Sequence, residues 1–536
     1  MSLTPKLLSF AVMMALGGTA AAANTNSPAV GRALGLLQSH GSAVHASAQD
    51  RFAPRDVIVD RDGTEHVRFD RTFAGMPVIG GDFVVHSRGG QFKSASLTQR
   101  ETLKLATRAA IGPSDAIVSA GAEFGSKFTG SPSASLVVYA RSATPQLAYQ
   151  VGMKGNDAAG NERDMTYIVH ASSGKVLDRW SNIETGKPGG GGTAVTCNSP
   201  VAATGSGNTL YTGPVTLNTT GCSAGNFQLK DTTRGSGYTT NMANGTSGSG
   251  VIFNGPDNLW GNGLASNAET AAADAHAGIA ATWDYFKNIH LRNGIDGLGT
   301  GALSKVHYGR NYVNAFWSDG CYCMSFGDGD GVTYGPLVNL DVAGHEMTHG
   351  VTSRTAKLVY SGESGGINES TSDIFGTMVE FNVNSPNDVP DYLIGEELYL
   401  SNPGNTKAFR YMYNPALEGA GRSVNCWSSG VGSLDVHYSS GPGNHFFYLL
   451  AEGSGPSQVF SNGSVTSPTC NGSSVTGIGR AAAQAIYYKA LTVYMTSNTN
   501  YAGARAATLS AAASIYGSGS VQYNAVAAAW SAVNVN

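Results

Sequence analysis

Charge is scarce in this sequence, and neither sign of charge predominates. Charged residues make up 13% of the 536 residues, against about a quarter in typical soluble proteins. The formal net charge of −4 leaves no electrostatic case for a nucleic-acid or anionic-membrane partner. Glycine is abundant instead, with 71 residues, so we expect an uncharged polar surface with many turns.

Long apolar runs are also missing. Beyond the N-terminus, no run reaches the roughly 18 residues that would span a bilayer. One short run, LLSFAVMMALGG, follows Lys6, and the small residues TAAAA come next, ending near Ala23. This order predicts a secretory signal peptide over residues 1–23 rather than a buried helix. We therefore expect a soluble exported protein without a membrane anchor.

Cysteine is absent from the first 196 residues, and the rest of the chain contains six. An even number of cysteines in an exported chain favours disulfides. A metal-binding role for the C-x-C pair is the alternative, although no second pair completes such a site. Sequence order suggests three bonds, Cys197–Cys222, Cys321–Cys323 and Cys426–Cys470, while other pairings remain open.

The chain divides at a glycine-rich stretch. Residues 24–183 combine strand-like alternation with two short helical patterns, which predicts a mixed α/β unit. ETGKPGGGGTA, residues 184–194, predicts an exposed, flexible boundary. Residues 195–340 suggest short strands with one helix at 267–290, and helices dominate from residue 341 onward. We therefore expect the second half to form a β-rich lobe followed by an α-rich lobe.

AGHEMTHG, residues 343–350, is the most specific motif. Asp341, His345 and His349 recur at every fourth residue, so a helix would place them on one face. Catalytic zinc sites have three protein ligands and a water. Glu346, directly after the first histidine, could take a proton from that water. The motif therefore predicts two zinc ligands and a general base.

A second helix offers the third ligand. In SGGINESTSDIFGTMVEF, residues 364–381, Glu369 and Asp373 share a helix face. We expect Glu369 to bind zinc and Asp373 to accept the free N–H of a ligand histidine. A solvated acidic stripe is the alternative. The apolar residues on the same helix favour burial, and buried carboxylates need a partner.

Other carboxylates suggest a second metal. Clustered carboxylates repel one another unless a hard cation lies among them. Carboxylate oxygens are ligands that select calcium. The alternative is that they are dispersed surface acids. The expected calcium ligands are Asp341, Glu380, Asp391 and Glu396.

Several ordered motifs together resemble the thermolysin family of secreted zinc neutral metalloproteases. They are HEMTH followed by ESTSD after nineteen intervening residues, NAFW at 314–317, GDGDG at 327–331 and DVHYSSG at 435–441. The short D-V-H spacing resembles the pseudolysin and vibriolysin branch. The resemblance covers residues 195–536. HVRFDRTFAGMPVIGGDFVVH and MTYIVHASSGKVLDRW, within residues 24–183, resemble the propeptide of this family.

The resemblance implies roles for individual residues. His345, His349 and Glu369 match the zinc ligands, and Glu346 matches the general base. Tyr360 and His437 match the pair that stabilises the oxyanion, with Asp435 orienting His437. Arg410 matches the residue that holds the substrate carbonyl, and Asn314 and Ala315 match contacts to the substrate backbone. The pocket for the residue after the scissile bond would be lined by Tyr334, Leu337, Val342, Ile394 and Phe409, although each is equally typical of a protein core.

The resemblance also implies an α+β organisation with a two-lobe catalytic domain behind an α/β propeptide. We expect a signal peptide at 1–23, a propeptide at 24–188, a β-rich lobe at 189–350 and a helical lobe at 351–536. The implied protein is a secreted monomeric endopeptidase with one zinc ion and at least one calcium ion. It would cut protein and peptide substrates on the amino side of large hydrophobic residues, after removal of its inhibitory, folding-assistant propeptide.

Other functions fit the sequence less well. A metzincin would need a histidine where Thr355 stands, and a zinc aminopeptidase would need an exopeptidase signature such as G-x-M-E-N. An exported binding module without catalysis is disfavoured by the intact Glu346, Tyr360 and His437. The unusual CYC sequence, residues 321–323, lies beside the expected substrate strand and leaves its effect on specificity open.

Overall fold

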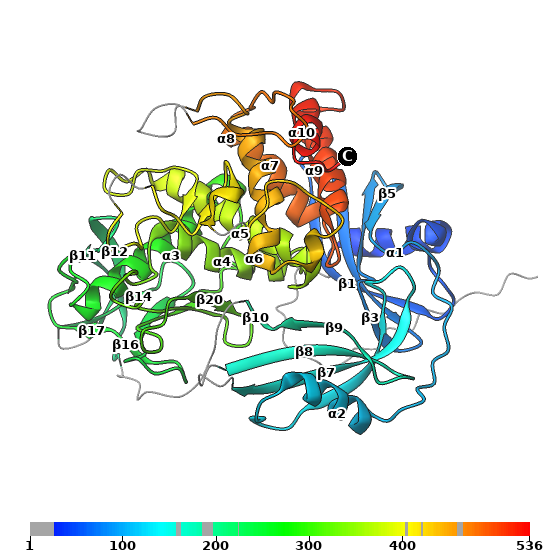
Figure 1. Ribbon diagram of the computed structural model, residues 1–536, viewed down its shortest axis with the longest axis horizontal. Helices are drawn as coiled ribbons and strands as arrows, with labels where there is room; N and C mark the ends of the chain where they lie inside the picture. The colour runs from blue at the N-terminus through cyan, green and yellow to red at the C-terminus, as the bar shows by residue number, and fades with distance from the viewer. Residues whose placement is uncertain are drawn as a thin grey trace, which may run out of the picture.

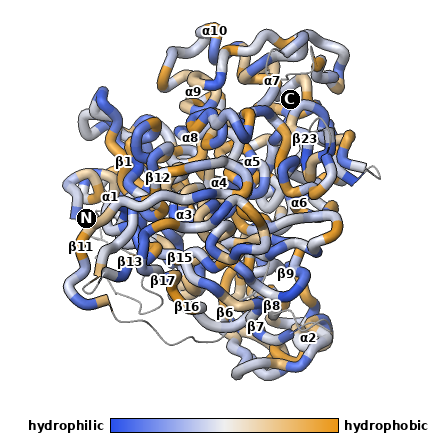
Figure 2. Tube along the Cα trace, turned by 90° about the vertical axis from the view of Figure 1, so that its left-hand side faces the viewer, coloured by the Kyte–Doolittle hydropathy of each residue, from blue (hydrophilic) through white to orange (hydrophobic). Residues whose placement is uncertain are grey.

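The computed structural model describes residues 26–156, 162–184, 197–222, 225–402, 406–419, 422–457 and 465–536. The predicted signal peptide and nearly all of the glycine-rich stretch lie outside these residues. Within them, no helix is both long enough and apolar enough to cross a bilayer. Figure 2 shows hydrophobic and hydrophilic residues interspersed along most elements.

The N-terminal region is built on one sheet of nine strands, ordered β5-β4-β2-β3-β6-β7-β8-β9, with β1 paired to β2. Helix α1 packs on the first strands and helix α2 on the last ones, each over its own hydrophobic cluster (Figure 1). The parallel pair β3–β6 joins the two halves. The elements are α1 (Pro28–His40), the 3-10 turn η1 (Gly41–Val44), β1 (Asp50–Val59), β2 (Thr64–Phe73), β3 (Met76–Ile79), β4 (Phe83–Arg88), β5 (Gln91–Leu97), α2 (Pro113–Phe124), β6 (Ser133–Tyr139), β7 (Gln146–Asn156), β8 (Glu162–His170) and β9 (Val176–Ser181).

A β-rich lobe follows. One sheet runs β10-β20-β21-β19-β15-β14 with β16 beside β15, and a second runs β17-β13-β12-β11-β18. Helix α3 (Ala268–His290) contacts both sheets, and its buried alanines allow a close approach. The strands are β10 (Ile183–Glu184), β11 (Val201–Asn208), β12 (Pro214–Cys222), β13 (Asn226–Gln228), β14 (Lys230–Asp231), β15 (Gly237–Asn241), β16 (Val251–Ile252), β17 (Asn254–Gly255), β18 (Leu259–Trp260), β19 (Leu303–Val306), β20 (Ala315–Ser318) and β21 (Cys323–Phe326).

Helices dominate the rest of the chain, and α4 and α5 lie at its centre (Figure 1). A Cβ added at Gly376 would lie 2.4 Å from the Asp341 carbonyl oxygen, so glycine allows these two helices to touch. The elements are α4 (Leu340–Arg354), α5 (Gly362–Val383), the paired strands β22 (Leu393–Ile394) and β23 (Arg410–Tyr411), the 3-10 turns η2 (Pro415–Leu417) and η4 (Val431–Ser433), α6 (Val436–Ser439), α7 (Gly441–Ala451), α8 (Arg480–Lys489), the π-helical turn η5 (Ala490–Tyr494), α9 (Tyr501–Tyr516) and α10 (Val521–Ala532).

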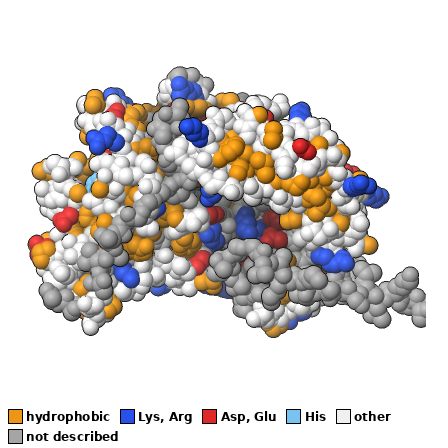
Figure 3. Space-filling view, turned by 90° about the horizontal axis from the view of Figure 1, so that it is seen from below, with side chains coloured by type: hydrophobic (Ala, Val, Ile, Leu, Met, Phe, Trp, Pro, Cys, Tyr) orange, Lys and Arg blue, Asp and Glu red, His pale blue; other side chains and the backbone are white. Residues whose placement is uncertain are grey.

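Three disulfides join the pairs suggested by sequence order, Cys197–Cys222, Cys321–Cys323 and Cys426–Cys470. The two sulfurs of the C-x-C pair are thus bonded to each other and are not offered to a metal. Seen from below, most described side chains on the surface are uncharged; several charged ones lie in a hollow near the middle, and others are scattered over this face (Figure 3). This matches the low charge content of the sequence.

The N-terminal region reaches the β-rich lobe through β10, the strand that follows β9 in the chain and joins the sheet of that lobe. β10 pairs antiparallel with β20 and forms the edge of this sheet, so that Ile183 lies opposite Ser318 and Glu184 opposite Trp317. Two arginines, the buried Arg68 and the partly buried Arg141, anchor the N-terminal region on the helical lobe. Arg68 donates to the carbonyl of Met495 at 2.8 Å, and Arg141 donates to the carbonyl of Ser361 at 3.0 Å.

Candidate metal centre and active site

Helices α4 and α5 bring together three side chains that suit a metal ion. His345 and His349 lie one turn apart on α4, and Glu369 faces them from α5. Their ligand atoms all lie within 4.8 Å of one another, and all three residues are buried. The Nε2 atoms of the two histidines are 3.0 Å apart, and Glu369 Oε1 is 3.4 Å from His349 Nε2. Within the described part of the chain, Glu369 Oε2 has no hydrogen-bond partner, so the donor set fits a cation.

The other nitrogen of each histidine is held by a partner. His345 Nδ1 donates to Asp373 Oδ1 at 2.8 Å, and His349 Nδ1 lies 2.9 Å from Asn368 Oδ1. These bonds fix the ring orientations and leave both Nε2 atoms for a metal. Asn368 is absent from the sequence-based prediction. Its position directly before Glu369 is the signal that could have identified it.

Asp373 connects the histidines to a second layer of side chains. Arg410 donates to it from Nε at 2.7 Å and from Nη2 at 2.6 Å, and Asn444 donates from Nδ2 at 2.8 Å. Burial alone would raise the pKa of Asp373, but Arg410 and His345 hold that pKa well below its usual range. Asn444, on α7, also escaped prediction, because nothing in its local sequence marks it.

Two polar side chains stand beside Glu369 at the same site. The Tyr360 hydroxyl donates to Glu369 Oε1 and lies 3.4 Å from His437 Nε2. His437 Nδ1 donates to Asp435 Oδ1 at 2.7 Å. Burial alone would lower the pKa of His437, but the Glu369 carboxylate and the bond to Asp435 raise it above its ordinary value. Both candidates for oxyanion stabilisation therefore lie at the candidate metal site. Glu346, one residue after His345, is buried on α4.

The predicted substrate contacts divide among several elements. Ala315 begins β20 and Asn314 directly precedes it, while Arg410 begins β23. Leu337 and Val342 share a core cluster against which Tyr334 and Phe409 pack, with the last two rings 5.2 Å apart. Ile394 belongs to the core of the helical lobe and pairs with Arg410 across β22 and β23.

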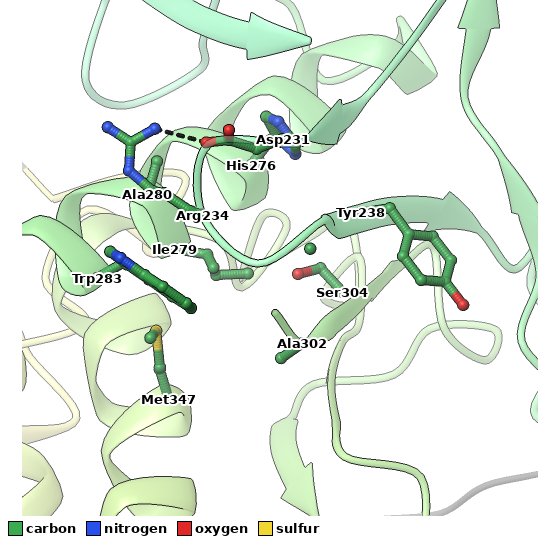
Figure 4. Close-up of a pocket in the computed structure, with 11 residues that line it drawn as sticks. Asp231, Arg234, Tyr238, His276, Ile279, Ala280, Trp283, Ala302, Ser304 and Met347 are labelled. Atoms are coloured by element: carbon green, nitrogen blue, oxygen red, sulfur yellow. Dashed lines mark hydrogen bonds and ion pairs between the residues drawn. The ribbon is translucent and has the colours of Figure 1, made fainter. Parts of the chain in front are cut away.

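A cavity lies on another side of α4, between α3 and strand β15 (Figure 4). Met347 reaches it from α4, and none of the predicted substrate residues lines it. Two of its polar residues already have partners. Arg234 pairs with Asp231 at 2.5 Å, and His276 Nδ1 lies 2.9 Å from Thr239 Oγ1. We therefore do not assign the reaction to this cavity.

A second buried cluster is purely acidic. The carboxylates of Glu380, Asp388 and Glu396 lie within 4.8 Å of one another, and both Glu380 oxygens lack a hydrogen-bond partner among the described residues. Burial, followed by the neighbouring carboxylates, raises the pKa of Glu380 well above its ordinary value. Such a group suits a hard cation with oxygen ligands. Asp388 was not predicted, although it lies in the loop that directly follows α5.

Asp341 and Asp391 are buried near this acidic cluster, and their charges contribute to the raised pKa of Glu380. Each also accepts backbone hydrogen bonds. Asp341 Oδ2 accepts from the Gly395 amide at 2.7 Å, and Asp391 Oδ1 accepts from the Leu393 amide at 2.6 Å. The structure thus places the four predicted calcium ligands in one region and adds Asp388.

Three family models match the chain. Residues 204–353 match the catalytic domain of thermolysin metallopeptidases, and residues 356–535 match their alpha-helical domain. Residues 50–98 match the fungalysin/thermolysin propeptide motif.

Individual proteins are similar as well. The transglutaminase-activating metalloprotease of Streptomyces mobaraensis is 45% identical over 496 residues, which cover 91% of this chain and 61% of that protein. The thermolysin of Alicyclobacillus acidocaldarius is 38% identical over 513 residues, which cover 91% of this chain and 86% of that thermolysin. Among solved structures, a precursor of protealysin from Serratia proteamaculans shares 29% identity over 56% of this chain and 87% of its own, with a TM-score of 0.43.

Proposed function

This chain belongs to the thermolysin family of metallopeptidases, and from that premise we propose that it is a zinc-dependent endopeptidase with His345, His349 and Glu369 as the zinc ligands. The grouping of these three side chains carries the proposal. Two imidazole nitrogens and one carboxylate match the ligands of catalytic zinc sites, which keep one position for water. Family membership supports the choice of zinc over other metals.

Glu346 is the general base of the proposed reaction. Bound zinc would polarise the substrate carbonyl and lower the pKa of the attacking water. Glu346 takes a proton from this water and passes it to the departing amine. Tyr360 and His437 donate hydrogen bonds to the oxygen on which negative charge develops, and Asp435 orients His437. These four side chains favour catalysis over the alternative, an exported binding module.

Peptide substrates would bind in an extended conformation along β20. Asn314 and Ala315 would contact the substrate backbone, and Arg410 would hold a carbonyl. A large apolar residue after the scissile bond would be buried by Tyr334, Leu337, Val342, Ile394 and Phe409. Its burial contributes about 25 cal/mol per Å², so cleavage is expected on the amino side of Leu or Phe.

We propose that Glu380, Asp388 and Glu396, with Asp341 and Asp391 nearby, hold at least one structural calcium ion. The unpartnered carboxylate oxygens of this cluster support the assignment. We also propose that the protein is secreted, a view supported by the predicted signal peptide at residues 1–23.

Residues 24–188 would form a propeptide that inhibits the enzyme and assists its folding. Because β10 occupies the edge of β20, the propeptide and an extended substrate would compete for the same strand. We place the division between the catalytic lobes after Arg354, where α4 ends, rather than after residue 350 as the sequence suggested.

Incubation of the mature chain with peptides containing single Leu or Phe residues tests this function. Fragment masses should show internal cuts on the amino side of those residues. A zinc chelator should stop the cleavage, and added Zn²⁺ should restore it. Cleavage that persists in the chelator would refute the metal mechanism, and release of single terminal residues would indicate an exopeptidase. A binding module would retain the peptides without cutting them.

A further inference from the structure

The Cys321–Cys323 disulfide closes the hairpin that joins β20 to β21. Ser318, the last residue of β20, pairs with Cys323, so the hairpin begins where the strand ends. The other edge of β20 is the one that β10 occupies, with Ile183 opposite Ser318. The disulfide therefore lies at the end of the strand along which an extended peptide would pair.

The direction of β10 shows which part of a peptide would meet this hairpin. Residue 183 lies opposite Ser318 and residue 184 opposite Trp317, so the chain runs away from the hairpin and toward Asn314. A substrate that follows the same direction has its N-terminal residues beside the hairpin. The substrate residues that follow the scissile bond then lie farther from the hairpin, toward Asn314.

Asp319 ties the hairpin to the helix that carries both metal-site histidines. Its Oδ1 accepts hydrogen bonds from Trp317 Nε1 at 2.8 Å, Ser353 Oγ at 2.9 Å and Arg354 Nη1 at 2.6 Å. Ser353 and Arg354 form the last turn of α4. One carboxylate thus connects the end of the substrate strand to the end of α4.

Tyr322, between the two cysteines, makes a second connection. Its φ of 52° lies in the left-handed region, which residues other than glycine seldom adopt. In this conformation its ring meets the Trp317 ring at 5.3 Å and the Arg354 guanidinium at 5.3 Å. Trp317 in turn packs on Gly350, where an added Cβ would lie 3.0 Å from the indole. Gly350 directly follows His349.

We propose that the Cys321–Cys323 disulfide is a specificity element, which positions β20 against α4 and so sets the affinity for substrate residues on the N-terminal side of the scissile bond. The inference rests on the proposed peptidase function. Without the bond, Tyr322 is free to leave the left-handed conformation, and Asp319 loses its fixed place at α4. The edge of β20 then shifts at the hairpin end. His345, His349 and Glu369 stay in place, because α4 and α5 hold them independently.

The test compares three peptides cut by the mature enzyme. One is a short blocked dipeptide, the second has three more residues on its N-terminal side, and the third has three more on its C-terminal side. In the double variant Cys321→Ser/Cys323→Ser, KM for the N-terminally extended peptide should rise roughly three- to tenfold, as expected for the loss of one or two strand hydrogen bonds. Its kcat, and both constants for the other two peptides, should stay the same.

Asp319→Asn provides a second variant that keeps the disulfide, so the result does not depend on folding of the cysteine variant. It weakens the bonds to Ser353 and Arg354 and should shift KM in the same selective way. Asp284→Asn is the matched control. Asp284 pairs with Arg234 at 2.6 Å and is exposed to a degree similar to Asp319, but it lies on α3, and its substitution should leave all three KM values unchanged.

An unchanged KM for the N-terminally extended peptide in both hairpin variants would overturn the inference while leaving the peptidase function intact. An equal rise of KM for all three peptides would overturn it too, because that pattern indicates general loosening of the site. Failure of the wild-type enzyme to cut any of the peptides would instead refute the proposed function on which the inference rests.

Discussion

Asp373 accepts a hydrogen bond from His345 Nδ1 at 2.8 Å, and the same carboxylate binds the Arg410 guanidinium through a bidentate pair of hydrogen bonds. The orientation of a metal-site histidine and the position of the proposed carbonyl-binding arginine therefore depend on one buried group. Because the carboxylate is fully buried, neither partner can be replaced by solvent. Substitution of Asp373 should therefore change metal affinity and substrate binding together.

Asp373→Asn is expected to weaken zinc binding by about 10- to 100-fold, the usual effect of losing a carboxylate behind a ligand histidine. It also leaves the Arg410 charge without its partner, which costs about 3–5 kcal/mol for a buried pair. Competition with a chromogenic chelator measures the first effect and thermal unfolding the second. Asp435→Asn is the control, since Asp435 orients His437 rather than a metal-site histidine; it should reduce turnover and leave zinc affinity unchanged. Equal zinc affinity in the Asp373 variant would contradict the assignment.

Glu346→Ala should retain zinc and the fold but abolish peptide hydrolysis. The side chain is not one of the three grouped ligands, so its removal leaves the metal set intact. A positioned general base contributes about 10²- to 10⁴-fold to rate. Metal content and melting temperature check the first part, and turnover of a Leu-containing peptide checks the second. Hydrolysis at the wild-type rate would end the proposed mechanism.

Sequence reasoning succeeded where helix geometry alone relates the residues. His345 and His349 are one turn apart on α4, as are Glu369 and Asp373 on α5, and regular spacing is sufficient to place each pair on one face. The expectation that α5 faces α4 rested on the need of a catalytic zinc site for a third protein ligand, which Glu369 could supply, and the family resemblance implied the same. The structure then supplies a physical reason, since Gly344 and Gly376 allow the two backbones to meet.

Other features depend on tertiary contacts and leave no local signal. Asn444 reaches Asp373 from α7, and Asp388 joins the acidic cluster from an irregular loop. The pairing of β10 with β20 joins segments that are more than a hundred residues apart in sequence. A two-residue strand beside a glycine-rich stretch has no periodicity from which such a partner could be deduced.

Calcium should stabilise the mature enzyme, and the Glu380→Gln variant should lose that stabilisation. At a calcium concentration about 100 times Kd, binding adds about 2.7 kcal/mol to the free energy of unfolding. In a calcium chelator, the variant should be at least as stable as the wild type, because it removes one of several buried, mutually repelling carboxylates. Asp257→Asn, an exposed substitution, is the control. Calcium-dependent stabilisation of equal size in Glu380→Gln and wild type would rule out this cluster as the site.

Docking of the N-terminal region should depend on Arg68. This side chain is 2% exposed and donates to the carbonyls of Met495 and Thr492 at 2.8 and 3.1 Å. Arg68→Met leaves both buried carbonyls without these donors, which costs about 1–3 kcal/mol for each group. The melting temperature of the uncleaved precursor should therefore fall, measured in a Glu346→Ala background that prevents self-processing.

The control for Arg68 is Arg88→Met. Arg88 pairs with Asp62 at 3.2 Å, but both side chains are more than half exposed, and such surface pairs contribute about 0–1 kcal/mol. The melting temperature of the Arg88→Met variant should stay close to that of the Glu346→Ala precursor from which it is made. An equal effect of the two substitutions would indicate that Arg68 is not an anchor of the interface.

The uncleaved precursor should lose stability in mild acid through His86. This residue shares a hydrogen bond of 2.7 Å with His66 Nδ1, lies 2.9 Å from Ser96 Oγ, and meets the Tyr494 ring of the helical lobe at 5.0 Å. Burial, followed by the charges of His66, Arg68 and Lys489, lowers the pKa of His86 from 6.5 to about 3, against a smaller opposing effect of Asp60.

The sign of the effect follows from which state binds the proton. Between pH 6.5 and about 3 the unfolded chain protonates His86 and the folded precursor does not, so stability decreases as the pH falls through this range. The decrease approaches about 1.4 kcal/mol per pH unit for a single group. Urea unfolding of the Glu346→Ala precursor at pH 7, 6 and 5 should therefore give a steeper loss than the same precursor carrying His86→Gln. The difference between the two series of unfolding free energies excludes the contribution of carboxylates that titrate in the same pH range. Identical slopes of unfolding free energy against pH would show that His86 is not held neutral in the folded precursor.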